Sequence, residues 1–397
     1  MNRIYRNILI ILFLCVSAIL SAKAPKYIFI FIGDGMGAPD VHATNLYKQM
    51  TEGKESSLLM TQFPVAGLVT THCANDIITD SPAAGTALAT GVKTNLKYVG
   101  IDKNKKPLKS FFQVMKEQGK GISLLTTNAP DDATPASFFA SSTSRYKFYQ
   151  IDTEMAQSNF DFIGGARLRG DSDKNRKTKP VYDIMRENGY TIAEGMESYQ
   201  QVKNNDKIIL LSTNAEEPNA IGLNIDQLPG AMKLSEMTAA ALAHLDKRYH
   251  KKGFCMMVEG GDIDHTNHVK DLGGTVHEVM GFDEALKVAY AFYRRYPDET
   301  LILVTADHET GGLSLGLQSS KYSVDLSPLK YQKISEIRFG KELDRRLSKN
   351  GSFSWPQMKK YLEEKLGFWS EYPLSLSEEA RLMTAFDNAC IKKRGKE

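Results

Sequence analysis

Cysteine and excess charge are both scarce in this 397-residue chain. It has 4 cysteines, and its 50 Lys and Arg residues nearly balance 47 Asp and Glu residues. Cys73, Cys255 and Cys390 lie far apart, so one pair at most could bridge, and neither a disulfide framework nor a thiol-metal cluster is indicated. Nucleic-acid and anionic-membrane surfaces need a concentrated basic excess, so the balanced charge argues against both partners.

Long apolar runs are missing except near the amino terminus. Arg3 and Arg6 precede an apolar stretch over residues 8–20, and small residues follow as far as Ala24. This order is typical of a cleavable secretory signal, and the run is shorter than the roughly 20 residues that a membrane-spanning helix needs. The sequence predicts a signal peptide over residues 1–24, no membrane span after its cleavage, and a secreted or periplasmic protein.

The remaining sequence alternates between two kinds of segment. Short runs of β-branched and apolar residues predict buried strands at Tyr27–Ile32, Ile122–Thr126, Ile208–Leu211, Phe254–Val258 and Leu301–Thr305. Helical periodicity marks Ser110–Gln118, Pro180–Asn188, Ser235–Tyr249, with Ser235 as its cap, and Val276–Arg295. The alternation predicts an α/β fold, in which a central, mostly parallel sheet carries helices on both faces.

The pattern changes toward the carboxyl end. From about Gln318 the sequence is polar and favours helices, with candidates at Ile334–Leu347, Pro356–Lys365 and Ser377–Asn388. We therefore expect one α/β domain over residues 25–317 and a helical region over residues 318–397. The charged stretch Arg167–Lys179 is expected to be an exposed loop whose charges face water.

Acidic side chains recur where the predicted strands end. They are Asp34, the pair Asp131 and Asp132, Glu259 and Asp307. Carboxyl ends of parallel strands meet at the ligand-binding edge of a sheet, so these acids are expected to converge there. One such acid alone is more often a helix cap or a loop anchor. Clustered carboxylates, however, repel one another unless cations neutralise them, and divalent metals are the usual solution.

The densest set of metal-ligand side chains lies in residues 259–268, which contain three acids and two histidines. Oxygen and imidazole ligands at this density suit zinc with a magnesium neighbour. Asp264 and His268 are four residues apart, so a helical turn would place them on one side. Asp307 and His308 add a carboxylate and an imidazole at another strand end. The alternative is a pair of exposed histidines in a polar loop.

Ser81 is the candidate nucleophile. It precedes Pro82, a residue favoured at a first helical position, so Ser81 is expected to be a helix N-cap. A capping serine is common, but its hydroxyl would also lie beside free helix N–H groups, where it can meet an anion. No GxSxG motif surrounds Ser81, so its activation would come from a metal. Arg145 is either a surface cation or, opposite a metal cluster, a bidentate phosphate clamp.

Taken together, these residues resemble the alkaline phosphatase family. The similarity rests on Ile32-Gly-Asp34-Gly-Met-Gly, Thr79-Asp80-Ser81, Asp132-Ala-Thr134, Ser144-Arg145, Val258-Glu259-Gly with Ile263-Asp264-His265 and His268, and Thr305-Ala-Asp307-His308. The resemblance implies an alkaline-phosphatase-like catalytic domain over residues 25–317. It also implies hydrolysis of small phosphate monoesters through a phosphoserine intermediate, with two zinc ions and one magnesium, and a possible homodimer.

The resemblance assigns a role to each of these residues. Ser81 is similar to the nucleophile, Arg145 to the phosphate clamp, and Asp80 to the residue that orients the clamp. Asp34, Asp307 and His308 resemble the ligands of one zinc, Asp264 and His268 two ligands of the second zinc, and Asp34, Thr134 and Glu259 the magnesium site. Asp132 and His265 occupy positions that tune the magnesium surroundings and the phosphate contacts.

One departure from the family bears on activity. The family supplies a third histidine to the second zinc from a late strand, and no histidine follows His308 in this chain. We therefore expect a chain that lacks its carboxyl-terminal segment, with a weaker second zinc site and impaired turnover. The alternatives are a phosphodiesterase or sulfatase built on the same metal frame, or a non-catalytic protein that binds metal or phosphate.

Overall fold

The structure of the protein is a computed structural model in which residues 24–170, 178–214, 219–316, 323–348 and 353–394 are described. The predicted signal peptide, apart from Ala24, lies outside these residues. Within the described part, no helix has both the length and the apolar character needed to cross a membrane. Cys73, Cys255 and Cys390 are all free thiols.

A seven-stranded sheet forms the centre of the molecule, and every pair of neighbouring strands is parallel. In spatial order the strands are β4 (Tyr190–Glu194), β5 (Lys207–Leu211), β3 (Phe162–Gly165), β2 (Gly121–Thr126), β6 (Phe254–Gly260), β1 (Tyr27–Gly33) and β7 (Thr300–Ala306). The predicted α/β fold is confirmed. Strands β3 and β4 were not predicted, because β3 is short and half glycine and β4 carries polar residues.

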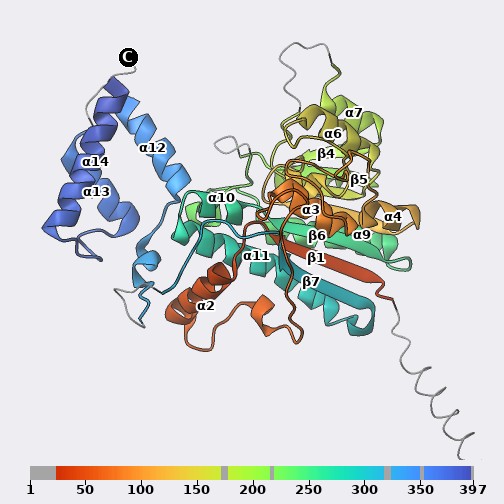
Figure 1. Cartoon of the computed structure of the whole chain (residues 1–397), viewed down its shortest axis with the longest axis horizontal. Coiled ribbons are helices and arrows are strands. Elements are labelled where there is room, and N and C mark those ends of the chain that lie inside the picture. Colours follow the sequence, from red (N-terminus) through yellow and green to blue (C-terminus); the bar gives the residue numbers. More distant parts are fainter. Residues whose placement is uncertain (1–23, 171–177, 215–218, 317–322, 349–352, 395–397) are drawn as a thin grey trace, which may run out of the picture.

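Helices lie on both faces of the sheet (Figure 1), and two apolar cores, one on each face, hold them in place. Successive side chains of a strand point to opposite faces. Accordingly, Phe29 and Phe31 of β1 belong to one core, and Ile30 and Ile32 to the other. The first core includes residues of α8 (Gly195–Val202), α9 (Leu234–Tyr249) and α11 (Leu272–Tyr293), with α2 (Ala38–Glu52) packed against it. The second includes residues of α3 (Ser81–Thr90), α4 (Phe111–Glu117), α6 (Phe148–Gln157) and α7 (Val181–Glu187).

The strand register brings the candidate site residues to one edge of the sheet. Gly33, the last residue of β1, pairs with Gly260 of β6 on one side and with Ala306 of β7 on the other. Asp34 follows Gly33 and Asp307 follows its pairing partner Ala306, so the two chain segments leave the sheet at the same level. The short helices α5 (Ala133–Ala136) and α10 (Asp262–His268) begin just beyond the same edge.

Strand β7 differs from the prediction that all strands are fully buried. Leu301 is 37% exposed and Leu303 is 47% exposed. On the other face of this strand, Ile302 and Val304 pack against the first core. The difference arises because β7 is an edge strand, and among the described residues only one of its faces is covered by helices.

Two local predictions also need correction. Ser235 lies inside α9, whose N-cap is Lys233, so Ser235 is not the cap. The stretch Arg167–Lys179 is not simply an exposed loop, because Leu168 and Gly170 are buried, although residues 171–177 lie outside the described part.

Helices also form the carboxyl-terminal region, which stands to one side of the sheet (Figure 1). They are α12 (Glu336–Ser348), α13 (Trp355–Leu366) and α14 (Leu376–Arg394). Ile334, Met358, Tyr361, Leu362 and Phe386 form a separate apolar cluster among them. The proposed boundary near residue 317 stays a prediction.

Candidate active site

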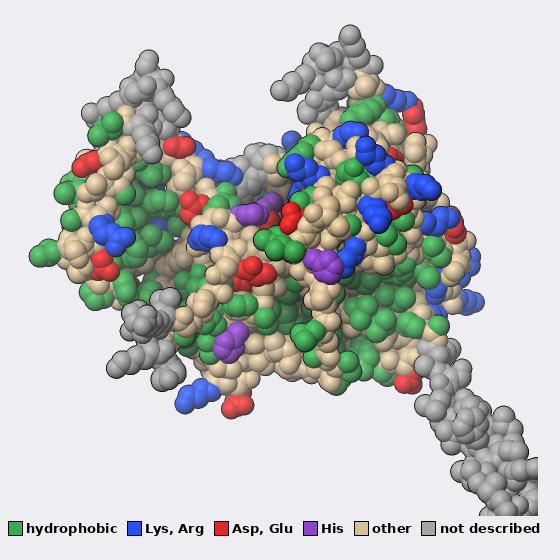
Figure 2. Space-filling view, viewed as in Figure 1, with side chains coloured by type: hydrophobic (Ala, Val, Ile, Leu, Met, Phe, Trp, Pro, Cys, Tyr) green, Lys and Arg blue, Asp and Glu red, His purple; other side chains and the backbone are tan. Residues whose placement is uncertain are grey.

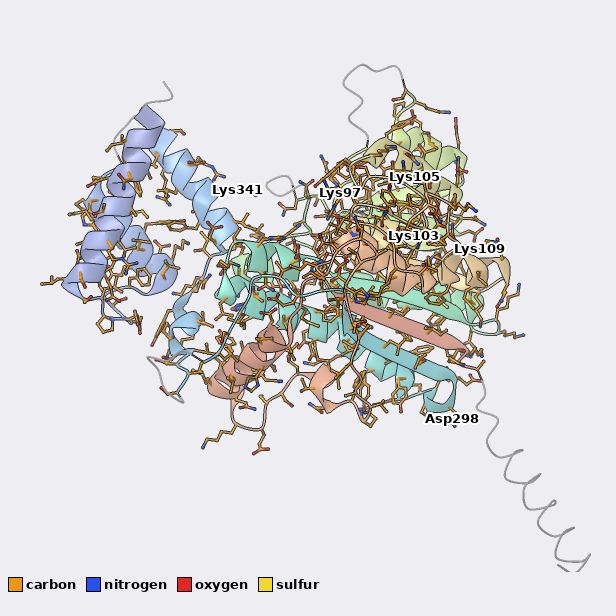
Figure 3. All side chains as sticks on the ribbon, in the orientation of Figure 1. Lys97, Lys103, Lys105, Lys109, Asp298 and Lys341 are labelled. Carbon is orange, nitrogen blue, oxygen red and sulfur yellow. The ribbon has the colours of Figure 1, made fainter. Side chains whose placement is uncertain are left out.

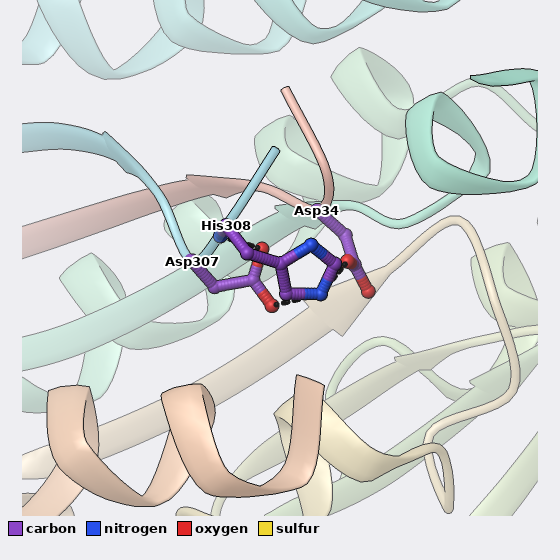
Figure 4. Close-up of side chains that lie close together, drawn as sticks. All are labelled: Asp34, Asp307 and His308. Carbon is purple, nitrogen blue, oxygen red and sulfur yellow. Dashed lines mark hydrogen bonds and ion pairs between the residues drawn. The ribbon is translucent and has the colours of Figure 1, made fainter. Parts of the chain in front are cut away.

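Three candidate metal ligands converge beyond β1 and β7 (Figure 4). Nε2 of His308 lies 3.4 Å from Oδ1 of Asp34 and 3.5 Å from Oδ2 of Asp307. One ligand atom from each residue lies within 4.8 Å of the others. In the part of the chain that the structure describes, this is the one group of three His, Cys, Asp or Glu side chains with that property. Two oxygens and one nitrogen at this spacing suit a zinc ion.

A glycine turn allows the cluster to close. Gly35 has a φ of +63°, and its N–H donates to Oδ1 of Asp307 over 3.1 Å. A Cβ at this position would lie 2.6 Å from Oδ1 of Asp264. Glycine is therefore required here both for its left-handed backbone and for the space it leaves beside a second acid.

Ser81 is not the helix N-cap that the sequence predicted. Asp80 caps α3, because its Oδ1 accepts the N–H of Ala83 over 3.3 Å, and Ser81 is the first helical residue. The Oγ of Ser81 lies 3.2 Å from Nε2 of His308. Ser81 is 5% exposed. The hydroxyl is thus at a helix amino terminus and in contact with the carboxylate–histidine cluster.

Asp132, rather than Asp80, is the carboxylate that contacts Arg145. Nη2 of Arg145 donates to Oδ1 of Asp132 over 2.6 Å. The second oxygen of Asp80 accepts the backbone N–H of Lys97 over 2.8 Å. Burial alone would raise the pKa of Asp132, but the charges of Arg169 and Arg145 outweigh it and lower that pKa to about 2.

Asp34 also faces the residues expected to hold magnesium. Oγ1 of Thr134 donates to Oδ2 of Asp34 over 3.5 Å. Glu259, fully buried at the end of β6, accepts a short hydrogen bond from Oγ1 of Thr126. Hydroxyl and carboxylate oxygens are the ligands that magnesium prefers.

The buried carboxyl groups at this edge of the sheet disfavour one another's ionisation. Burial, reinforced by the charges of Asp307 and Asp264, raises the pKa of Asp34 well above its usual range. Burial also raises the pKa of Glu259 to about 8. Asp34 Oδ1, Glu259 Oε1 and Asp307 Oδ2 are buried with no hydrogen-bond partner among the described residues. Buried oxygens without donors are what a bound cation would satisfy.

The second predicted zinc pair lies on α10. Nε2 of His268 is 3.3 Å from Oδ2 of Asp264, and the side chain of His268 is 69% exposed. The helical spacing therefore brings these two side chains together. They belong to no group of three close ligands among the described residues.

His265, on the same helix, contacts an acidic side chain. Its Nδ1 lies 3.1 Å from Oδ1 of Asp262. Burial alone would lower the pKa of His265, but the contact with Asp262 and the charges of Asp132 and Asp264 raise it to about 9. The neighbouring acids Asp262, Asp132 and Asp264 thus favour the protonated form of His265.

Two residues of the site were not predicted. Oγ1 of Thr310 donates to Oδ1 of Asp264 over 2.6 Å and lies 3.2 Å from Nδ1 of His308, so it links the two candidate zinc groups. Its closeness in sequence to His308 was the available signal. Arg169 donates to both Asp131 and Asp132. Arg169 was not predicted because it lies in the charged stretch Arg167–Lys179, whose side chains were expected to face water.

Comparisons with known proteins point to a single family. Residues 25–374 match the family described as alkaline phosphatase. Alkaline phosphatase 4 of Bacillus subtilis is 35% identical over 306 residues, covering 75% of this chain and 64% of that protein. Alkaline phosphatase 3 of the same organism is 31% identical over 304 residues, covering 73% of this chain and 62% of that protein. The aligned part thus spans less than two thirds of either relative.

Solved structures match over more of the chain. The cold-active alkaline phosphatase of the psychrophile Shewanella sp. aligns with a TM-score of 0.78 and 26% identity, covering 91% of this chain and 84% of that one. The alkaline phosphatase of Thermus thermophilus aligns with a TM-score of 0.76 and 28% identity, covering 92% and 75%. A variant of the alkaline phosphatase of the Antarctic bacterium TAB5, with Mg bound in its M3 site, aligns with a TM-score of 0.64 and 27% identity, covering 77% and 85%.

Proposed function

This chain belongs to the alkaline phosphatase family, and we propose from that premise that it hydrolyses phosphate monoesters through a phosphoserine intermediate on Ser81. The observation that carries the proposal is the position of the Ser81 hydroxyl, 3.2 Å from Nε2 of His308 at the edge of the acidic cluster. A hydroxyl at a helix amino terminus can approach an anionic substrate, because helix N–H groups favour negative charge.

The side chains present suit the metals that the family resemblance implies. Asp34, Asp307 and His308 would hold one zinc, Asp264 and His268 a second, and Asp34, Thr134 and Glu259 a magnesium. Three of the carboxylate oxygens in these sets are buried without a donor, which supports the assignment. When bound, such ions supply Lewis acidity, which favours the deprotonated serine and offsets charge on the phosphoryl group.

The chain's own residues would divide the remaining work. Arg145, which is partly exposed, would bind two phosphate oxygens through its planar fork. The Oγ of Ser81 loses its proton and bonds to phosphorus as the bond to the leaving alcohol oxygen breaks, and that oxygen takes up a proton. Water then attacks the phosphoserine, which releases inorganic phosphate and returns a proton to Oγ. Asp80 would hold the first turn of α3 in position throughout.

Location and assembly belong to the same proposal. The leader-like residues 1–24 support export to the periplasm or the exterior, and the family resemblance supports a homodimer. Fractionation of cells and sedimentation of the purified protein test these two points separately from catalysis.

The test of the proposed function is hydrolysis by the purified protein with zinc and magnesium added. We expect p-nitrophenyl phosphate to be cleaved faster than bis(p-nitrophenyl) phosphate or p-nitrophenyl sulfate, because Arg145 adds a cation suited to a doubly charged group. Ser81→Ala should abolish this difference while leaving the thermal unfolding profile unchanged. Rates equal to those of Ser81→Ala would instead favour a non-catalytic metal- or phosphate-binding protein.

A faster diester or sulfate reaction would favour the two enzymatic alternatives. His268 is exposed and pairs with Asp264, but among the described residues no third close ligand joins them. A catalytic zinc site usually has three protein ligands, so we expect slow turnover at limiting zinc. A rate that rises steeply with added zinc supports this expectation.

A further inference from the structure

Two arginines from different segments share the carboxylate of Asp132, one on each oxygen. Oδ1 accepts from Nη2 of Arg145 over 2.6 Å, and Oδ2 accepts from Nη1 of Arg169 over 3.0 Å. Arg145 lies between α5 and α6, and Arg169 lies beyond β3. The family resemblance gave Arg145 a role as phosphate clamp but gave Arg169 none.

Arg169 is itself fixed on two further sides. Its Nε donates to Oδ1 of Asp131 over 2.9 Å, and its backbone N–H donates to Oδ2 of the same residue over 2.6 Å. Its guanidinium carbon lies 4.1 Å from the ring centroid of Phe148, a cation–π contact. The side chain of Asp131 is fully buried, and that of Arg169 is 22% exposed. Arg169 is therefore a rigid cation and not a solvated surface charge.

This arrangement limits how Asp132 can bind Arg145. A carboxylate facing a single arginine tends to bind it through both oxygens in a fork-to-fork pair. Oδ1 of Asp132 also accepts the N–H of Ala133 over 2.6 Å, and Oδ2 accepts from Arg169, so Arg145 contacts Asp132 through Nη2 alone. Within the described residues this is the one hydrogen bond of the Arg145 side chain. The other guanidinium donors of Arg145 are thereby left for a substrate.

We propose, on the basis of the phosphatase activity proposed above, that Arg169 is a positioning residue that holds Asp132 to a one-point contact with Arg145. Arg169 balances the charge of Asp132, so the attraction between Asp132 and Arg145 does not compete with phosphate binding. Without Arg169, Oδ2 of Asp132 loses its partner and turns to Arg145 while Ala133 still holds Oδ1, so the fork that binds phosphate is occupied. The effect falls on phosphate affinity and KM more than on kcat.

A purely structural role for Arg169 predicts a different result, since Arg169 also anchors Asp131 and stacks on Phe148. Such a role would act on folding and would be independent of Asp132. A double-mutant cycle between Arg169 and Asp132 separates the two roles, because it isolates the part of the effect that passes through Asp132.

The experiment measures the dissociation constant of inorganic phosphate by calorimetry, and KM and kcat for p-nitrophenyl phosphate, on the metal-loaded protein. Arg169→Met should weaken phosphate binding and raise KM by about tenfold, the factor that corresponds to roughly 1.4 kcal/mol. In the background of Asp132→Asn, whose neutral side chain attracts Arg145 less, adding Arg169→Met should change phosphate affinity less than twofold. An equal loss in both backgrounds overturns the proposal.

Two further variants keep the test decisive. Arg169→Lys keeps the charge but not the planar fork, so it should cause a smaller loss that also disappears with Asp132→Asn; this pair serves if Arg169→Met does not fold. Arg248→Met removes another poorly exposed arginine, on α9, with 16% side-chain exposure. It should leave phosphate affinity unchanged, and an equal loss there would also overturn the proposal.

The outcome for Arg169 is independent of the outcome for catalysis. If the wild-type protein binds phosphate but shows no hydrolysis that depends on Ser81, the proposed function fails. The calorimetric cycle still reports whether Arg169 acts through Asp132.

Discussion

The Oγ of Ser81 lies 3.2 Å from Nε2 of His308, which joins the start of α3 to the segment that follows β7. The same nitrogen faces Asp34 and Asp307. Because one imidazole lies at the meeting point of the hydroxyl and both acids, its loss should affect metal binding as well as catalysis.

We expect His308→Ala to weaken zinc binding by about tenfold or more, since even the loss of a residue that supports a metal ligand costs that much. The measurements are metal content after dialysis and the rise in melting temperature on adding zinc. His42→Ala, which removes an exposed histidine of α2, is the matched control and should bind zinc as the wild type does. Equal zinc affinity in all three proteins would contradict the assignment of His308 as a ligand.

Asp80 should contribute to stability through its cap. Asp80→Ala removes the acceptor for the N–H of Ala83 and is expected to lower the free energy of unfolding by about 1 kcal/mol. Asp80→Asn keeps an acceptor and should lower it much less. Urea unfolding of the two variants measures the difference. If the two variants unfold alike, the side chain of Asp80 does not stabilise α3 as a cap.

Lys97, labelled in Figure 3, is exposed, and its backbone N–H donates to Oδ2 of Asp80, the residue before the candidate nucleophile. A cation there should attract dianionic substrates, so Lys97→Gln is expected to lower kcat/KM at low ionic strength. The difference should vanish near 1 M salt, where screening acts over about 3 Å. Lys109→Gln is the control, because Glu117 already pairs with Lys109 at 2.7 Å. If Lys97→Gln lowers kcat/KM equally at low and high salt, the charge of Lys97 does not act by attracting the substrate from solution.

The sequence predicted the strands that end at candidate site residues better than it predicted the other strands. Strands β1 and β6 are nearly continuous apolar runs, as expected of parallel strands buried on both faces. Strand β3 was missed because two of its four residues are glycine, and each has little room for a Cβ. Gly164 and Gly165 pack against Leu125 and against the backbone of Asn128, contacts that exist only in the folded chain.

The topology of the sheet predicts that the acids lie at one edge, but it does not predict which side chains each acid contacts. The parallel sheet places Asp34 and Asp307 at one edge, which strand order alone suggests. Nothing in the sequence distinguishes Asp132 from Asp80 as the partner of Arg145, because that choice depends on how the chain folds back after α5. Figure 2 shows that histidine and acidic side chains also lie on the surface near the middle of one face, between the carboxyl-terminal helices and the rest of the molecule.

His244 on α9 should make the protein sensitive to acid. The residue is 2% exposed and its ring meets that of Phe162 edge-on at 5.5 Å. Its Nε2 lies 3.1 Å from the backbone oxygen of Asp206, which fixes the proton on Nε2, and its Nδ1 is buried without a partner among the described residues. Protonation of Nδ1 would place an uncompensated charge in the first core.

Burial, with help from the charge of Arg248, lowers the pKa of His244 to about 4. In the unfolded chain a histidine takes up its proton near pH 6.5. Between these values the unfolded state binds more protons, so the free energy of unfolding falls as the pH falls, by up to about 1.4 kcal/mol per pH unit. This contribution is fully present above pH 6.5. Below about pH 4 the folded state also binds the proton, and the loss stops growing.

His244→Gln removes the titrating group while keeping a side-chain N–H for the oxygen of Asp206. We expect the variant to lose stability less steeply between pH 6.5 and pH 4 than the wild type, as measured by urea unfolding at a series of pH values. His42→Gln, at an exposed position, should follow the wild-type slope. Parallel curves for His244→Gln and the wild type would contradict the prediction, because they would mean that folded and unfolded His244 take up their proton at the same pH.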